Sequence, residues 1–160
     1  MLLNLLIGIA MMALCLALQI SLLARTLIYY ARHQAHLRNS GYLRTLGILS
    51  GVLGLLMFGN LGQVGLWALL FQLLGEFDQY RDAFYHSAVN FATLGYGDIV
   101  MSEERRLLGP LQAMNGVLMV GVSTAALMTT LRDAVKHAAV GLAAGRGDAD
   151  RVEELVEKPG

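Results

Sequence analysis

Three long stretches without a charged side chain dominate this sequence: residues 2–24, 46–74 and 107–131. Each is long enough to cross a bilayer as an α-helix, which takes about 20 apolar residues. A fourth apolar segment, 84–92, is too short to cross and is predicted to be a re-entrant helix. Backbone that leaves a helix at membrane depth is tolerated only when it is buried in protein or lines a watery path. We therefore predict an all-α membrane protein with three transmembrane helices, a re-entrant helix and a loop that lines such a path.

The composition agrees with a membrane protein and argues against several other classes. The 160 residues are 56% hydrophobic and 15% charged, and their net charge is zero, so nothing suggests nucleic-acid binding. Cys15 is the only cysteine, which excludes an intrachain disulfide and a cysteine metal site. The sequence shows no nucleophile–base pair, metal-ligand cluster or phosphate loop, so we do not expect an enzyme.

The first stretch is expected to be a retained helix, residues 1–30, rather than a cleaved signal peptide. It has no basic residues before it, it is longer than a signal peptide's apolar core, and no Ala-x-Ala site ends it.

The loop charges predict the orientation of the chain in a cell membrane. Residues 25–44 carry four arginines, two histidines and no acid, so the positive-inside rule makes the basic linker 31–45 cytoplasmic. The N-terminus then lies outside, and the tail 132–160 lies in the cytoplasm. The same rule already accounts for the presence of the linker arginines. Three of them are also candidate contacts for anionic lipid headgroups, namely Arg32, Arg38 and Arg44.

The loop after the re-entrant helix reads Thr93-Leu94-Gly95-Tyr96-Gly97-Asp98. A dehydrated cation needs several oxygens at close range, arranged in rings. Successive carbonyls can point toward one axis only if the backbone alternates between left- and right-handed dihedrals, which Gly95 and Gly97 permit cheaply. Thr93 can add a hydroxyl oxygen at the inner end. This loop resembles the selectivity filter of the potassium channel family, where Thr-Val-Gly-Tyr-Gly is the usual form and carbonyls replace the ion's hydration shell.

The resemblance is to channels of the two-transmembrane pore-loop type, here with an additional N-terminal transmembrane helix. It implies a homotetramer, because one chain carries a single filter strand. It implies K⁺ bound at Thr93, Leu94, Gly95 and Tyr96, with Leu94 and Tyr96 side chains bracing the loop from behind, and no other cofactor. The implied pore domain, 46–131, comprises an outer helix 46–74, a pore helix 82–92, a filter 93–98 and an inner helix 103–131.

The inner helix supports the resemblance separately. Matched to the family, Gly116 falls on a gating-hinge glycine and Thr124 on a threonine that lines the inner cavity. Close helix packing is an equally good explanation for Gly116 and Gly121. Thr124 has a local alternative as well, which is a bond to a carbonyl of the preceding turn. Ser102 is expected to cap this helix, and Pro110 either kinks it or marks its real start.

The bracing of the filter departs from the family pattern. Some simple bacterial members carry a glutamate that pairs with the filter aspartate, and Val89 stands at that position here. Tyr85 stands where the family commonly has an aromatic residue that bonds this aspartate, so the resemblance implies that the Tyr85 hydroxyl bonds Asp98. Asn90 is likewise predicted to reach the Tyr96 hydroxyl. His86 is expected to be packed or hydrogen-bonded rather than to sense pH.

The leading hypothesis is a potassium-selective ion channel. A non-selective cation channel is the near alternative, and a non-conducting membrane scaffold subunit is the alternative from another class.

Overall fold

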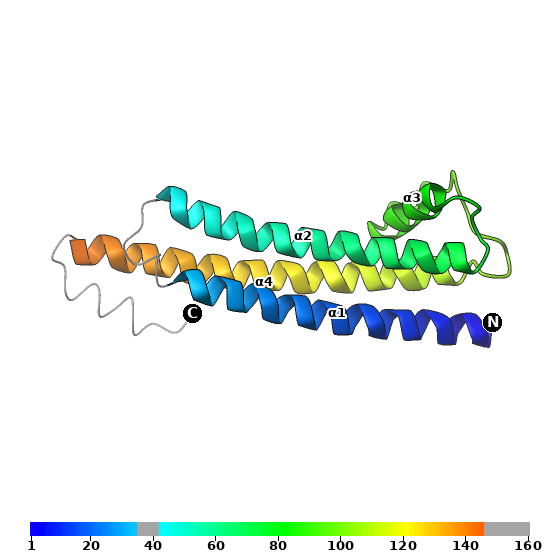
Figure 1. Cartoon of the computed structure of the whole chain (residues 1–160), viewed down its shortest axis with the longest axis horizontal. Coiled ribbons are helices and arrows are strands. Elements are labelled where there is room, and N and C mark those ends of the chain that lie inside the picture. Colours follow the sequence, from blue (N-terminus) through cyan, green and yellow to red (C-terminus); the bar gives the residue numbers. More distant parts are fainter. Residues whose placement is uncertain (35–41, 146–160) are drawn as a thin grey trace. The chain divides into compact units, whose positions relative to one another are not determined.

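The computed structural model describes residues 1–34 and 42–145, and these form helices and no strand. The helices are α1 (Leu2–Gln34), α2 (Tyr42–Leu73), α3 (Tyr80–Phe91) and α4 (Leu108–Gly145) (Figure 1). Stretches of α1, α2 and α4 are long and apolar enough to cross a membrane: Leu2–Arg32, Thr45–Leu73 and Leu108–Lys136. The chain is thus an all-α membrane protein with three candidate spans and one short helix. Arg38 and the side chain of Arg44 lie outside the described residues.

The chain divides into two compact units, and α1, α2 and α4 contribute residues to both. Unit 1 comprises Met1–Leu22 and Met57–Ser123, and unit 2 comprises Leu23–Leu56 and Thr124–Gly160. Within unit 2, Gly51 of α2 leaves room for the ring of Tyr29, because a Cβ there would lie 2.6 Å from the Tyr29 hydroxyl. Unit 1 contains α3 and the loop that follows it, and therefore the candidate site.

The apolar core of unit 1 joins residues from all four helices. Trp67 and Phe71 of α2 are fully buried, with their ring centroids 5.7 Å apart. Cys15 of α1, Ala83 of α3 and Leu108 of α4 belong to the same cluster, and all three are fully buried. Packing around two large aromatic side chains thus fixes the short helix α3 against the long ones.

Hydrogen bonds at the middle of α3 also hold this helix against its neighbours. The hydroxyl of Ser87, which is fully buried, donates to the Val64 carbonyl of α2 at 2.7 Å. The Gln112 side chain of α4 donates to the Ser87 carbonyl at 3.1 Å. In Figure 1, α3 lies beside the part of α2 that belongs to unit 1. A helix too short to span a membrane is therefore tied through one serine to both neighbouring helices.

The helix α4 begins at Leu108, later than the expected start at residue 103. Pro110 explains the difference, because a helix beginning at 103 would place the proline ring against the carbonyl of Arg106 and leave that carbonyl without a donor. The chain before Leu108 forms turns instead, with the Arg105 amide donating to the Ser102 carbonyl at 3.1 Å. The prediction that Ser102 caps this helix was therefore wrong, and Pro110 lies in the first turn. At its other end α4 continues past residue 131 to Gly145.

The helix α3 begins at Tyr80 rather than at residue 82. Its N-cap is Gln79, whose extended backbone makes no side-chain cap bond, and Asp82 lies in the first turn. A carboxylate there interacts favourably with the positive end of the helix dipole.

Candidate functional site

The loop after α3 has the alternating backbone that its glycines predict. Thr93 has φ +58°, Gly95 +58° and Gly97 +73°, whereas Leu94 and Tyr96 between them do not have positive φ. Every second residue is thus in the left-handed region, which turns successive carbonyls toward similar directions. Positive φ at Gly95 and Gly97 was expected from the sequence, and Thr93 extends the pattern by one step.

The positive φ of Thr93 results from the hydrogen bonds that end α3. Its amide donates to the Asn90 carbonyl at 2.9 Å, and the Leu94 amide donates to the Val89 carbonyl at 2.9 Å. This pair of bonds is a Schellman motif, whose capping residue is left-handed and is usually glycine. Left-handed backbone costs a residue with a Cβ about 1–2 kcal/mol, and β-branched threonine suits it poorly. The N-terminal end of the loop is therefore held in a strained conformation by the helix that precedes it.

The same motif ends α2, where the expected residue is present. The Gly75 amide donates to the Gln72 carbonyl at 2.9 Å, the Glu76 amide donates to the Phe71 carbonyl at 3.1 Å, and Gly75 has φ +76°. The capping residue is thus glycine at the end of α2 and threonine at the end of α3, where its hydroxyl lies at the start of the Thr93–Asp98 loop.

At the C-terminal end of the loop, Tyr85 and Asp98 meet as the resemblance implies. The Tyr85 hydroxyl donates to Oδ2 of Asp98 at 2.7 Å, and the Ile99 amide donates to Oδ1 at 3.1 Å. The tyrosine bond holds the pKa of Asp98 below its ordinary value, and the same bond raises the pKa of Tyr85. A carboxylate with a lowered pKa keeps such bonds at neutral pH and loses them only when the pH falls through that lowered pKa. Asp98 is therefore a negative charge at this end of the loop at neutral pH.

His86, the neighbour of Tyr85, holds the next residue of the loop. Its Nδ1 lies 2.9 Å from the Ile99 carbonyl oxygen, and its Nε2 lies 2.9 Å from Nδ2 of Asn90. These contacts fit a neutral ring that donates through Nδ1 and accepts through Nε2. Burial lowers the pKa of His86, which favours the neutral form. The expectation of a packed, hydrogen-bonded histidine was therefore confirmed.

The predicted contact between Asn90 and the Tyr96 hydroxyl is not formed in the described chain. The Asn90 amide faces His86, one helical turn earlier on α3, and Tyr96 is 65% exposed. A side chain four residues away on the same helix is always within reach, so this local partner prevails over a loop residue. Together, Tyr85 and His86 bind Asp98 and Ile99, so two adjacent residues of α3 fix two adjacent residues of the loop.

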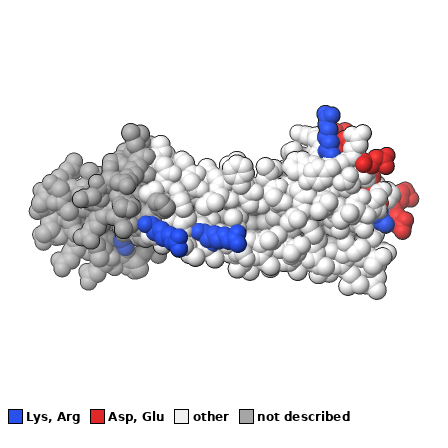
Figure 2. Space-filling model, viewed as in Figure 1, with Lys and Arg blue, Asp and Glu red and all other residues white. Residues whose placement is uncertain are grey.

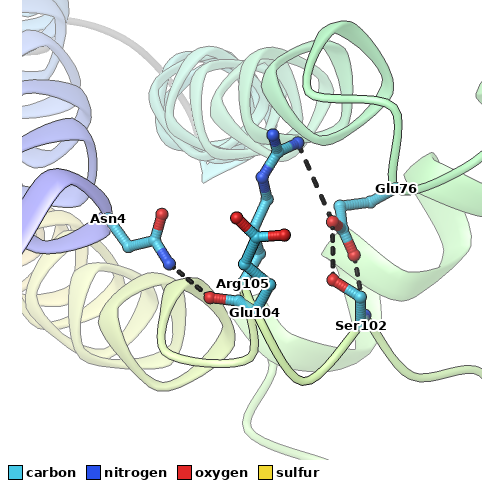
Figure 3. A network of polar contacts seen from close by, with 5 residues as sticks. All are labelled: Asn4, Glu76, Ser102, Glu104 and Arg105. Atoms are coloured by element: carbon cyan, nitrogen blue, oxygen red, sulfur yellow. Dashed lines mark hydrogen bonds and ion pairs between the residues drawn. The ribbon is translucent and has the colours of Figure 1, made fainter. Parts of the chain in front are cut away.

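Glu76 fixes the chain farther along, before α4 begins (Figure 3). Its carboxylate accepts from the Ser102 amide at 2.7 Å and from the Ser102 hydroxyl at 2.9 Å, and Arg105 Nη1 lies 3.8 Å from it. Asn4 of α1 donates to the Glu104 carbonyl. Glu76 and Asn4 were not singled out in the sequence, because only the fold brings residues so distant in the chain to this loop.

Acidic side chains gather around this end of unit 1. In Figure 2 they lie over the loops on either side of α3. The same loops and helix ends also carry arginines, which offset part of the negative field. The acidic residues are Glu76, Asp78, Asp82, Asp98, Glu103 and Glu104, and the basic ones are Arg81, Arg105 and Arg106.

The two glycines proposed for α4 lie in different surroundings. Gly116 is buried against the C-terminal end of α3, where an added Cβ would lie 2.2 Å from the Phe91 carbonyl oxygen. Around Gly121 an added Cβ would meet nothing within 4 Å. Close packing therefore accounts for Gly116 but not for Gly121 within the described chain. Thr124 is exposed in the single chain.

Comparison with known proteins supports the same region as functional. A family model described as an ion channel matches residues 61–133, which include part of α2, all of α3, the loop and much of α4. No curated protein and no solved structure matches the chain. The family match supports an ion channel family, ion conduction and a multi-pass membrane location, and it suggests a protein that is not an enzyme. Such channel domains typically form oligomers.

Proposed function

We propose that this protein is a potassium-selective channel and that Thr93–Asp98 is its selectivity filter. The observation that carries the proposal is the alternation of left-handed backbone at Thr93, Gly95 and Gly97. Carbonyls that turn toward one axis can replace the hydration shell of a cation, and the residue types match the potassium channel pattern. In this proposal K⁺ is the transported substrate, and oxygens of Thr93, Leu94, Gly95 and Tyr96 coordinate it.

The conducting form we propose is a homotetramer, since one chain supplies only one wall of a closed path. The side chains of Leu94 and Tyr96 are 55% and 65% exposed in the single chain. A cavity of about 350 Å³ lies behind the loop, lined by residues that include His86, Asn90, Thr93 and Gly95. Large apolar side chains that are exposed beside a functional loop indicate a missing partner surface.

We place the acidic loops around α3 on the outer side of the cell membrane, from the arginines of the linker. Arg32 is exposed near the end of the first span, so it is available for the proposed contact with anionic lipid headgroups.

Purified full-length protein in liposomes tests the function. We expect the reversal potential to follow the K⁺ gradient by about 59 mV per tenfold change, with little shift when Na⁺ replaces an inert cation. Equal permeability to Na⁺ and K⁺ would favour the non-selective cation channel, and absence of any flux would favour the non-conducting scaffold.

The bond between Tyr85 and Asp98 predicts the behaviour of the outer end of the filter. We expect Tyr85→Phe to accelerate the slow loss of conduction several-fold under sustained current, because Asp98 loses its hydroxyl donor. The measurement is the time course of current at constant voltage. Tyr80→Phe is the matched control, since the Tyr80 hydroxyl, also on α3, donates to the Gly65 carbonyl of α2 at 3.3 Å and not to Asp98. Identical kinetics in Tyr85→Phe and the unmodified protein would exclude this role.

A further inference from the structure

In the part of α1 that belongs to unit 1, the amide side chains lie on the side that faces the rest of the unit. Asn4 is 7% exposed and Gln19 is fully buried, whereas Leu14, Leu16 and Ile20 are between 47% and 59% exposed. A helix that served only as an anchor in lipid would gain nothing from burying amides. The family match begins at residue 61, so it leaves α1 without a role.

Gln19 is the centre of a polar network between three membrane helices. Its Nε2 donates to the Ser123 hydroxyl of α4 at 2.9 Å, and its Oε1 accepts from Nε2 of Gln63 of α2 at 2.7 Å. Asn60 of α2 also contacts Ser123, with its Nδ2 3.2 Å from the hydroxyl oxygen. Gln63 is 3% exposed and Ser123 is 8% exposed, so most of the network is excluded from solvent.

The network restrains α4 relative to α1 and α2. In hydrocarbon a displaced amide or hydroxyl finds no water, so a shift of α4 at Ser123 would break bonds that solvent cannot replace. The packing of Gly116 against Phe91 fixes α4 at a second point, closer to the filter. Each interhelical bond of this kind is worth about 0.6 kcal/mol on average, so the network biases a movement of α4 rather than forbidding it.

We propose that Gln19 is a positioning residue for conduction: by joining Ser123 to Gln63 it holds α4 in place, which makes α1 a working part of the pore. The role in conduction rests on the proposed channel function, whereas the restraint on α4 does not.

Two measurements on the full-length protein in liposomes test the proposal, with Gln19→Leu as the first variant. In single-channel recordings we expect the mean duration of either the open or the closed level to shorten about threefold or more, with an unchanged reversal potential. The second measurement is the reaction rate of Cys15 with a membrane-permeant maleimide. Cys15 is the only cysteine and is fully buried in unit 1 beside α2 and α4. Loosening of α1 should therefore speed its modification about threefold or more.

Ser21→Ala is the matched control, because Ser21 is an exposed polar residue of α1 whose hydroxyl donates to the Ala17 carbonyl of its own helix. It should change neither measurement. Ser123→Ala breaks the network from α4 and keeps the test open if Gln19→Leu does not fold. In the double variant the combined effect should be smaller than the sum of the two single effects, since both variants remove the bond between Gln19 and Ser123.

Unchanged dwell times and unchanged Cys15 reactivity in Gln19→Leu would overturn the proposal, as would strictly additive effects in the double variant. If the unmodified protein passes no ions, the proposed function fails, but the Cys15 rates still decide whether Gln19 holds α1 and α4 together.

Discussion

Gly116→Ala is expected to destabilise the folded protein by about 3 kcal/mol or more and to abolish conduction. The added Cβ would lie 2.2 Å from the Phe91 carbonyl oxygen and 2.9 Å from its carbonyl carbon. These are backbone atoms at the end of α3, so no side chain can rotate away to make room. Either α4 moves away from α3 or the end of α3 shifts, and the proposed filter begins two residues after Phe91. The measurements are the thermal midpoint of the purified protein and K⁺ flux in liposomes.

Gly121→Ala is the matched control on the same helix. An added Cβ meets nothing within 4 Å there, and alanine favours a helix over glycine by up to about 1 kcal/mol, so the thermal midpoint should stay or rise slightly. The comparison separates the two roles considered for Gly116. If Gly116 serves only as a hinge, the Gly116→Ala protein would fold with an unchanged thermal midpoint and differ only in channel opening. That result would contradict the packing role.

The length of the stretches without charged side chains was enough to predict the three spans. Hydrocarbon excludes charged side chains whichever helices pack against one another. This length did not predict helix ends. The start of α4 depended on Pro110, whose ring and missing amide limit how early the helix can begin. The Ser102 hydroxyl was free to bind Glu76 instead, a partner on a loop that sequence separation conceals.

Within the candidate site, local contacts were predictable and contacts between helices were not. The residue pattern was sufficient for the left-handed backbone at Gly95 and Gly97, and the family resemblance was sufficient for the bond between Tyr85 and Asp98. Asn90 was assigned to Tyr96, but a histidine one turn away on the same helix is the nearer partner.

Predicting the network around Gln19 would have required knowing how α1, α2 and α4 are rotated about their own axes. Apolar stretches that face lipid on one side and protein on the other carry little pattern that reveals this rotation. The available signal was the presence of amides, Asn4, Gln19, Asn60 and Gln63, inside stretches without charge.

Gly97→Ala is expected to abolish selective K⁺ conduction. Gly75→Ala is the matched control, because it separates a loss of stability from a change in the geometry of the proposed filter. The two glycines have nearly the same backbone, φ +73° and +76°, and at both an added Cβ would meet nothing within 4 Å. Each substitution therefore costs mainly left-handed strain, about 1–2 kcal/mol, and the two variants should lose similar thermal stability. At Gly75 that strain falls on the end of α2, where two backbone hydrogen bonds hold the turn. At Gly97 the backbone can relieve strain by rotating, and any rotation would turn a carbonyl of the proposed filter away from its axis.

The measurement is the K⁺ to Na⁺ permeability ratio of both variants in liposomes, beside their thermal midpoints. We expect Gly75→Ala to keep the selectivity of the unmodified protein and Gly97→Ala to lose either selectivity or flux. Retained selectivity in Gly97→Ala would mean that carbonyl orientation at this position does not determine which ion passes. Loss of selectivity in both variants would instead mean that general destabilisation, rather than filter geometry, explains the effect.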